Sequence, residues 1–289
     1  MNIAKALRRN LHSHTYRCKH ATGDALDYVS AAHECGADTY GISDHTTLPK
    51  DRFNNVRMAL AELDGYQQAV EDARLRFTDM TVLMGLECED FKDARSFYQD
   101  EILGERQFDY LIGAGHYTPI NGKWEDSYSG MSNAAKLRAY SAHLCEMMES
   151  DLYSFIAHPD VFGLSNKSWT EDLTACTHDI LAAAEACHKP LEVNGGGFRK
   201  QAANKTKGIP GYPWGQFWAI ASDYQITVIC NSDAHHPEHA LANIDDALEF
   251  CQTHGLSLAD DEQLGIAHRL NQGEAAMFSA PGKIHLGSS

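Results

Sequence analysis

Histidine and carboxylate side chains stand at the ends of seven short apolar runs in this 289-residue chain. In chain order these endings are His12-Ser13-His14, Ser43-Asp44-His45, Glu87, His116, His158-Pro159-Asp160, Glu192-Val193-Asn194 and Asp233-Ala234-His235. A single His-x-His pair means little, because 16 histidines in a chain of this length produce roughly one such pair by chance. The recurrence at every run is informative, and it indicates one shared site.

These side chains favour a metal site over other catalytic arrangements. A Ser/His/Asp site needs one nucleophile, one base and one orienting acid, far fewer imidazoles than this chain offers. Divalent ions bind neutral imidazole and ionised carboxylate, which stabilises such a crowded pocket. Mixed nitrogen and oxygen ligands suit Zn, Mn or Fe better than Ca or Mg. His12 and His14 point to the same side of an extended strand, so they can hold one ion.

Extended segments must position these side chains, and seven are predicted. They cover residues 10–14, 39–44, 82–87, 110–116, 154–158, 191–194 and 227–233. Almost continuous apolar runs such as TVLMGLE predict strands that are buried on both faces, as in a parallel sheet covered by helices. Helical patterns fall between the strands, at residues 25–35, 56–77, 134–149, 172–187 and 216–223. This alternation predicts an α/β fold, either a barrel or a doubly wound sheet.

No linker or repeat divides the chain, so we expect one domain over residues 1–289, with its core at about 8–255 and a loosely held tail at 281–289. The net charge of −16 disfavours nucleic acid and anionic membranes as partners. No apolar run reaches the length of about 18 residues that a transmembrane helix needs, and we expect no secretory signal because the N-terminal residues lack an apolar stretch. The eight cysteines are scattered and form no CxxC pair, which is typical of reduced thiols. We therefore expect a cytoplasmic protein.

The order of the motifs resembles that of the polymerase and histidinol phosphatase (PHP) family over roughly residues 8–240. The matching positions are His12, His14, His20, His45, Glu87, His116, His158, Asp233 and His235. The resemblance implies a distorted (β/α)7 TIM-like barrel of the PHP type, which agrees with the seven predicted units. It also implies three divalent metal ions.

The resemblance further implies how these ligands are shared. The implied sets are His12, His14, Glu87 and Asp233 for a first ion, Glu87, His116 and His158 for a second, and His20, His45 and His235 for a third. The nucleophile would be a metal-bound hydroxide held by Glu87, Asp233 and His235. Metal binding lowers the pKa of water to about 7, so that this nucleophile exists at neutral pH.

Substrate-binding groups are expected next to the ligands. Arg17 and Arg199 are the candidates, because a guanidinium fork suits a phosphate, although either could be a solvated surface charge. The three glycines at residues 195–197 predict a phosphate-binding backbone or a flexible turn. Acidic residues that either orient imidazoles or cap loops are Asp44, Asp160 and Glu192.

Residues 191–200 (LEVNGGGFRK) look most like the histidinol-phosphate phosphatase branch, with its Glu-Ile-Asn-Thr-Ser-Gly-Leu-Arg-Lys pattern. Gly195 and Gly196 replace Thr and Ser, and Trp214 replaces the Ser that follows Tyr-Pro. The resemblance implies hydrolysis of a small phosphorylated substrate, foremost histidinol phosphate in histidine biosynthesis. The alternatives are another PHP phosphoesterase, acting as a nucleotide phosphatase, phosphodiesterase or exonuclease, and a non-catalytic metal-binding module. The oligomeric state stays open.

Overall fold

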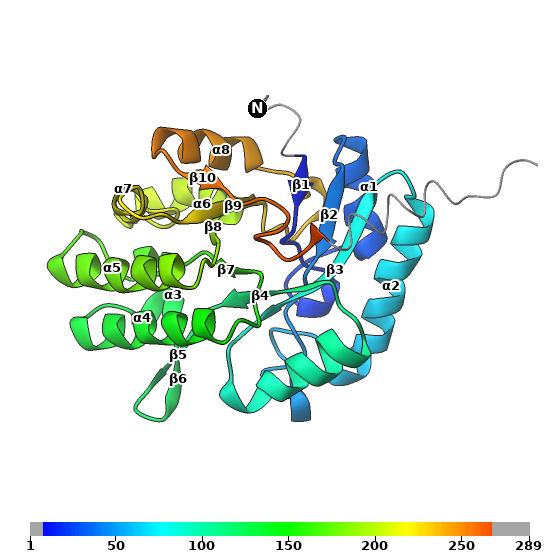
Figure 1. Cartoon of the computed structure of the whole chain (residues 1–289), viewed down its shortest axis with the longest axis horizontal. Coiled ribbons are helices and arrows are strands. Elements are labelled where there is room, and N and C mark those ends of the chain that lie inside the picture. Colours follow the sequence, from blue (N-terminus) through cyan, green and yellow to red (C-terminus); the bar gives the residue numbers. More distant parts are fainter. Residues whose placement is uncertain (1–7, 268–289) are drawn as a thin grey trace, which may run out of the picture.

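A curled sheet of parallel strands is the centre of the computed structural model, which describes residues 8–267 (Figure 1). The strands, in their order across the sheet, are β1 (Arg9–Asn10), β2 (Thr39–Ile42), β3 (Thr81–Cys88), β4 (Tyr110–Ala114), β7 (Phe155–Ala157), β8 (Leu191–Asn194), β9 (Thr227–Asn231) and β10 (Ser257–Leu258). Every neighbouring pair in this sheet is parallel. The predicted α/β class with a TIM-like barrel is confirmed, and β10 is an addition to the seven predicted strands. The tail predicted at residues 281–289 lies outside the described residues.

Side chains close the curled sheet where β1 meets β9. The side-chain carbonyl of Asn231 accepts the backbone N–H of Leu11 at 2.8 Å, and that of Asn10 accepts the N–H of Ser232 at 2.6 Å. An isolated parallel bridge joins the same two segments nearer the strand ends. β10 pairs instead with the beginning of β9. The barrel is therefore distorted at one seam, and buried amides bridge that seam.

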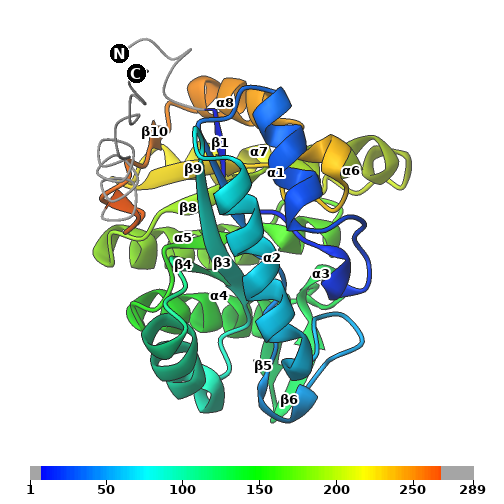
Figure 2. The same cartoon turned by 90° about the vertical axis from the view of Figure 1, so that its right-hand side faces the viewer.

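Helices cover the outside of the sheet (Figure 2). They are α1 (Ala25–Glu34), α2 (Leu63–Arg76), α3 (Ser127–Gly130), α4 (Ala134–Glu149), α5 (Glu171–Ala186), α6 (Gly195–Thr206), α7 (Gly215–Ala221) and α8 (Ile244–Thr253). The pair α1 and α2 packs over β2 and β3, and α4 packs against α5. The bounds of α4 are those predicted from the sequence. Within the described part of the chain, no helix is long and apolar enough to cross a membrane.

The helix predicted over residues 56–77 begins later, at Leu63. The backbone N–H of Ala59 donates to the Glu62 carboxylate at 2.7 Å. This bond stabilises the short 3-10 turn Leu60–Glu62 that directly precedes α2. The segment before it is an irregular loop that buries Arg57. Apolar residues in this loop pack against the core as a helix face would, so spacing alone did not separate loop from helix.

Several elements were not predicted. A hairpin of β5 (Tyr117–Ile120) and β6 (Lys123–Asp126) projects from the sheet after β4 and leads into α3. A π-helix spans Phe97–Glu105, and α8 follows β9. The turn predicted at residues 195–197 is instead the first turn of α6, and the Asn194 side chain caps it by accepting the N–H of Gly197 at 2.9 Å.

A second apolar cluster fills the inside of the barrel. Its members are Leu11, Leu83, Tyr110, Ile112, Ala114, Phe155, Ala157, Ile229, Ala259, Leu264 and Ile266. The Tyr110 hydroxyl donates to the Leu11 carbonyl at 2.7 Å, and its ring leaves no room for a side chain at Gly85, where a Cβ would lie 2.4 Å away. The packed region thus extends past residue 255, where the core was expected to end.

All eight cysteines are free thiols. The buried ones are Cys18, Cys88, Cys176, Cys230 and Cys251. Buried free cysteines of this kind pack as small apolar side chains.

Candidate active site

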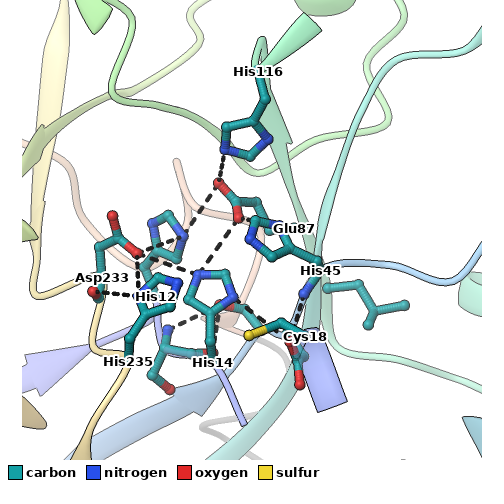
Figure 3. Close-up of polar contacts among 12 residues, drawn as sticks. His12, His14, Cys18, His45, Glu87, His116, Asp233 and His235 are labelled. Atoms are coloured by element: carbon teal, nitrogen blue, oxygen red, sulfur yellow. Dashed lines mark hydrogen bonds and ion pairs between the residues drawn. The ribbon is translucent and has the colours of Figure 1, made fainter. Parts of the chain in front are cut away.

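The carboxyl ends of the parallel strands bring the predicted ligand residues together (Figure 3). Eight of them lie within 4 Å of a partner in the cluster, namely His12, His14, His45, Glu87, His116, His158, Asp233 and His235. His235 lies 3.4 Å from Asp233, and the His20 ring faces both His45 and His235. All nine predicted positions therefore belong to one cluster.

Glu87 at the end of β3 is the centre of the cluster. Five imidazole nitrogens surround its carboxylate, at 3.3 Å (His12), 3.5 Å (His14), 2.9 Å (His45), 3.2 Å (His116) and 3.3 Å (His158). The side chain is almost completely buried. A carboxylate in this position can serve two ions at once, as the proposed bridging ligand must.

Asp233 faces Glu87 from the other end of the chain. Its Oδ1 lies 3.3 Å from His14 Nε2 and 3.7 Å from His12 Nε2. The backbone of Asp233 is in the left-handed region with φ of 51°, and that of His158 has φ of 30°. Non-glycine residues rarely adopt such angles, which cluster at functional sites. The tight turns at the ends of β7 and β9 thus aim these side chains inward.

His20, His45 and His235 form the outer part of the cluster. The His20 ring centroid lies 5.2 Å from that of His45 and 4.9 Å from that of His235. Cys18, which was not predicted as a ligand, lies beside them: its sulfur is within 4.8 Å of ligand nitrogens of His20 and His235. Burial raises the pKa of this thiol to about 12. The position of Cys18 two residues before His20 was the available signal.

Several polar atoms of the cluster are buried without a hydrogen-bond partner. They are His12 Nε2, His14 Nδ1 and Nε2, Glu87 Oε1 and Oε2, and His158 Nδ1. Buried polar atoms without partners are costly to a fold. Imidazole nitrogens and carboxylate oxygens in this number match the donor set of Zn, Mn or Fe ions. The residues present therefore fit transition-metal ions.

The electrostatics of the cluster shift the pKa values of its imidazoles in opposite directions. Burial lowers the pKa of His12, His14 and His116, but neighbouring carboxylates outweigh this effect and leave these pKa values raised, that of His116 to about 10. Burial raises the pKa of Glu87, but the surrounding imidazoles, His116 foremost, outweigh this effect and hold the pKa well below its ordinary value. Burial also holds the pKa of His45 and of His235 well below the ordinary histidine value, and the neighbouring His14 adds to this. Glu87 is thus ionised, and the two imidazoles are neutral with a free lone pair.

Acidic residues behind the cluster hold the imidazole rings. His12 Nδ1 lies 2.8 Å from Glu192, which also accepts the side-chain amides of Asn194 at 2.7 Å and Asn231 at 3.0 Å. Such contacts fix the orientation of a metal-ligating ring. Glu192 is thus placed to orient the His12 ring, the first of the two roles (orienting an imidazole or capping a loop) that the sequence suggested for it.

Glu89 has the same relation to another ring. His116 Nδ1 lies 2.6 Å from Glu89 Oε1. Glu89 was missed from the sequence, although it stands two residues after Glu87 and so points to the same side of the chain. Asp160, in contrast, accepts the N–H groups of Trp214 and Trp218 at 2.6 and 3.0 Å and caps that loop. Burial raises the Asp160 pKa to about 7.

A cavity of about 550 Å³ opens onto the cluster. Its lining comprises His20, His45, Val56, Arg57, Glu87, Glu89, His116, Tyr117, Tyr128, His158, Gly196, Arg199, Lys200, Asp233, His235, His236 and His239. Tyr128 comes from the unpredicted α3 and stacks on His116, with ring centroids 5.7 Å apart. The volume suits a small substrate.

The two arginines predicted to bind phosphate differ in their placement. Arg17 is not among the residues that line the cavity, and its guanidinium is paired with both carboxylate oxygens of Asp24. Arg199 lines the cavity, but its Nη2 donates to the carbonyls of Ser232 and Asp233 at 2.6 and 2.9 Å. Arg17 therefore lies away from the cavity and is engaged with Asp24, and Arg199 is largely engaged with the loop after β9.

The chain belongs to the PHP domain family, whose model matches residues 10–195. More particularly, it is 28% identical over 234 residues to a "Probable histidinol-phosphatase" of Deinococcus radiodurans, which covers 78% of this chain and 85% of that protein. A "Probable phosphatase" of Shewanella sediminis is 25% identical over 193 residues, 65% of this chain and 63% of that protein. The predicted family and enzyme class, a PHP phosphoric monoester hydrolase, are confirmed.

Solved structures share the fold. The putative histidinol phosphatase HisK of Listeria monocytogenes has a TM-score of 0.64 and 21% identity, and covers 80% of this chain and 96% of its own. The histidinol phosphate phosphatase of Lactococcus lactis, crystallised with zinc, L-histidinol and phosphate, has a TM-score of 0.66 and 18% identity, and covers 87% and 95%. These likenesses confirm the distorted barrel.

Proposed function

We propose that the protein hydrolyses histidinol phosphate to histidinol and phosphate at the carboxyl ends of its strands. The observation that carries this proposal is the cluster of nine ligand-type residues around Glu87, with buried unpaired polar atoms, at the base of a cavity of about 550 Å³. The histidinol-phosphatase name of the Deinococcus relative supports this substrate. So does the ligand set of the Lactococcus structure.

We infer that three divalent ions bind the cluster, with Zn, Mn and Fe as the candidates. Glu87 would bridge the first two sets of ligands, because imidazoles of both sets approach its carboxylate: His12 and His14 of the first, and His116 and His158 of the second. His20, His45 and His235 would hold the third ion, with the Cys18 sulfur nearby. Bound ions would supply Lewis-acid stabilisation of the phosphoryl oxygens and a water activated at neutral pH.

The protein's own side chains contribute orientation and exclusion of water. Glu192 and Glu89 fix the rings of His12 and His116, which keeps their metal-facing nitrogens in place. Tyr128 lies flat against His116 and forms a wall of the cavity, so that the substrate is enclosed on the side of the hairpin. Preorganised groups of this kind lower the barrier without rearranging during the reaction.

A substrate panel tests the proposal. Purified protein reconstituted with Zn, Mn or Fe should release phosphate from histidinol phosphate more efficiently than from nucleotides, and should leave bis-p-nitrophenyl phosphate almost intact. Phosphate release and kcat/KM are the measurements. Preference for the diester without turnover of histidinol phosphate would contradict the proposal and favour the phosphodiesterase alternative.

Substitution of Asp233 tests the metal site directly. We expect Asp233→Asn to lower kcat/KM by at least about 100-fold, more than the loss of a group that only orients a ligand, because an anionic ligand is removed. Metal content measured by mass spectrometry should fall in parallel. Asp223→Asn is the matched control, since Asp223 is exposed at the end of α7. Unchanged activity and metal content in Asp233→Asn would exclude this residue as a ligand.

A further inference from the structure

Three cationic side chains line the cavity, and their N–H groups are engaged to different degrees. They are Arg57, Arg199 and Lys200. The guanidinium of Arg199 is directed to backbone carbonyls of the loop after β9, including that of Ala242 at 3.2 Å. Its main structural effect is to hold that loop against α6. Few of its donors remain for a ligand.

Arg57 is engaged as well. Its Nη1 donates to the Thr46 carbonyl at 3.3 Å, and its Nη2 lies 3.7 Å from Glu89. Its Nε is buried and has no hydrogen-bond partner. Arg57 therefore completes the charge balance around Glu89 and ties the loop after β2 to the end of β3.

Lys200 is different, because its ammonium has no anionic partner. It hydrogen-bonds the Tyr212 hydroxyl at 3.3 Å, and within residues 8–267 no carboxylate forms an ion pair with it. Tyr212 is completely buried, and the Lys200 Nζ lies 5.9 Å from the centre of its ring. Lys200 is thus an exposed cation at the cavity lining, whose ammonium contacts only the buried Tyr212 among the described side chains and has donors to spare.

The glycines before Lys200 explain how α6 comes so close to the metal ligands. A Cβ at Gly197 would lie 2.2 Å from the Tyr212 carbonyl, and one at Gly196 would lie 2.9 Å from Asp233 Oδ2. Only glycine permits both approaches. The helix therefore begins against Asp233 and carries Lys200, one turn later, over the same side of the cavity.

We propose that Lys200 binds an oxygen of the substrate's phosphoryl group. The ligand chemistry is that of a phosphate dianion, for which a lysine ammonium is a strong point-charge partner. Charge remains spread over the phosphoryl oxygens throughout transfer, so a fixed cation there stabilises both bound substrate and transition state. This role rests on the proposed phosphatase function, and it takes the place that sequence reasoning gave to Arg17.

Phosphate binding to metal-loaded protein tests this role without requiring turnover. Isothermal titration with inorganic phosphate should give a dissociation constant about 10- to 100-fold higher for Lys200→Met than for the wild type, the loss typical of a hydrogen bond to a charged group. Lys205→Met is the matched control, because Lys205 is exposed on the same helix and its replacement removes the same charge. Lys200→Arg, which keeps the charge, should retain part of the affinity. Metal content should stay equal in all variants.

Two outcomes would overturn the proposal. One is phosphate affinity in Lys200→Met within about twofold of the wild type, and the other is an equal loss in Lys205→Met. Should Lys200→Met not fold, Lys200→Gln is judged by the same criteria. If histidinol phosphate is not hydrolysed but phosphate binding depends on Lys200, the substrate assignment fails while the role of Lys200 stands.

Discussion

Glu87 shows how much a single buried side chain determines in this protein. Five imidazole nitrogens approach its carboxylate within 3.5 Å, and neither of its oxygens has a hydrogen-bond partner. An arrangement without ions would leave these atoms desolvated and unpaired. The imidazoles around Glu87 are therefore suited to be metal ligands, and Glu192 and Glu89 behind them are suited to orient their rings.

Glu192 is the support whose removal is most informative. We expect Glu192→Gln to weaken zinc binding by about 10- to 100-fold, because the charge that fixes the His12 ring is lost while all nine proposed ligands remain. Competition with a chromophoric chelator measures the affinity. Glu249→Gln, on the exposed side of α8, is the control and should bind zinc like the wild type. Equal affinity in both variants would show that Glu192 has no role at the metal site.

At the scale of elements, the seam between β1 and β9 lacks a continuous ladder of backbone hydrogen bonds. Two buried asparagine side chains replace a continuous ladder there. Asn231 makes two of these side-chain contacts: its side-chain carbonyl accepts the Leu11 N–H across the seam, and its amide donates to Glu192 at 3.0 Å. The same residue thus connects barrel closure with the orientation of a metal ligand.

Loss of the Asn231 side chain should destabilise the fold. Asn231→Ala leaves a buried N–H of Leu11 without an acceptor and removes a donor from Glu192, which costs about 2–4 kcal/mol of unfolding free energy in total. Urea unfolding followed by circular dichroism measures this. Asn55→Ala, in the exposed loop before α2, should stay within about 0.5 kcal/mol of the wild type. A comparable loss in both variants would contradict a special role for the seam.

For the whole molecule, charge is divided between the surface and the cavity. The chain carries a net charge of −16, yet three cations and seven of the nine proposed ion ligands line the cavity. An acidic exterior disfavours polynucleotides, whose binding requires extended basic surfaces. A small phosphate ester that enters the cavity meets a different, positive environment once ions are bound.

Metal ions should also stabilise the whole fold. The proposed ligands come from strand ends spread between His12 and His235, so ions bound there join distant parts of the chain. At ion concentrations about 1,000 times the dissociation constant, binding adds about 4 kcal/mol, which raises Tm by roughly 10 °C for a protein of this size. Calorimetry before and after chelation measures the difference, and Mg²⁺ in place of Zn²⁺ is the control. An unchanged Tm would contradict strong ion binding by the folded state.

The sequence alone determined the features that depend on regular local structure. Parallel strands end at one face of a barrel, so ligand-type residues after seven apolar runs predicted one site. The structure brings together there the nine positions that the family resemblance implied. The bounds of α4 also followed from its apolar spacing. These predictions succeeded because side-chain direction in strands and helices repeats with a fixed period.

Only the tertiary structure decided where the long charged side chains end. Arg17 pairs with Asp24, Arg199 reaches the β9 loop, and Lys200 faces the cavity, although all three stand next to motifs of the site. The Asn10 and Asn231 bridges likewise join residues more than 200 positions apart. A flexible side chain takes its partner from whatever the fold brings near, and that depends on packing between distant segments rather than on local spacing.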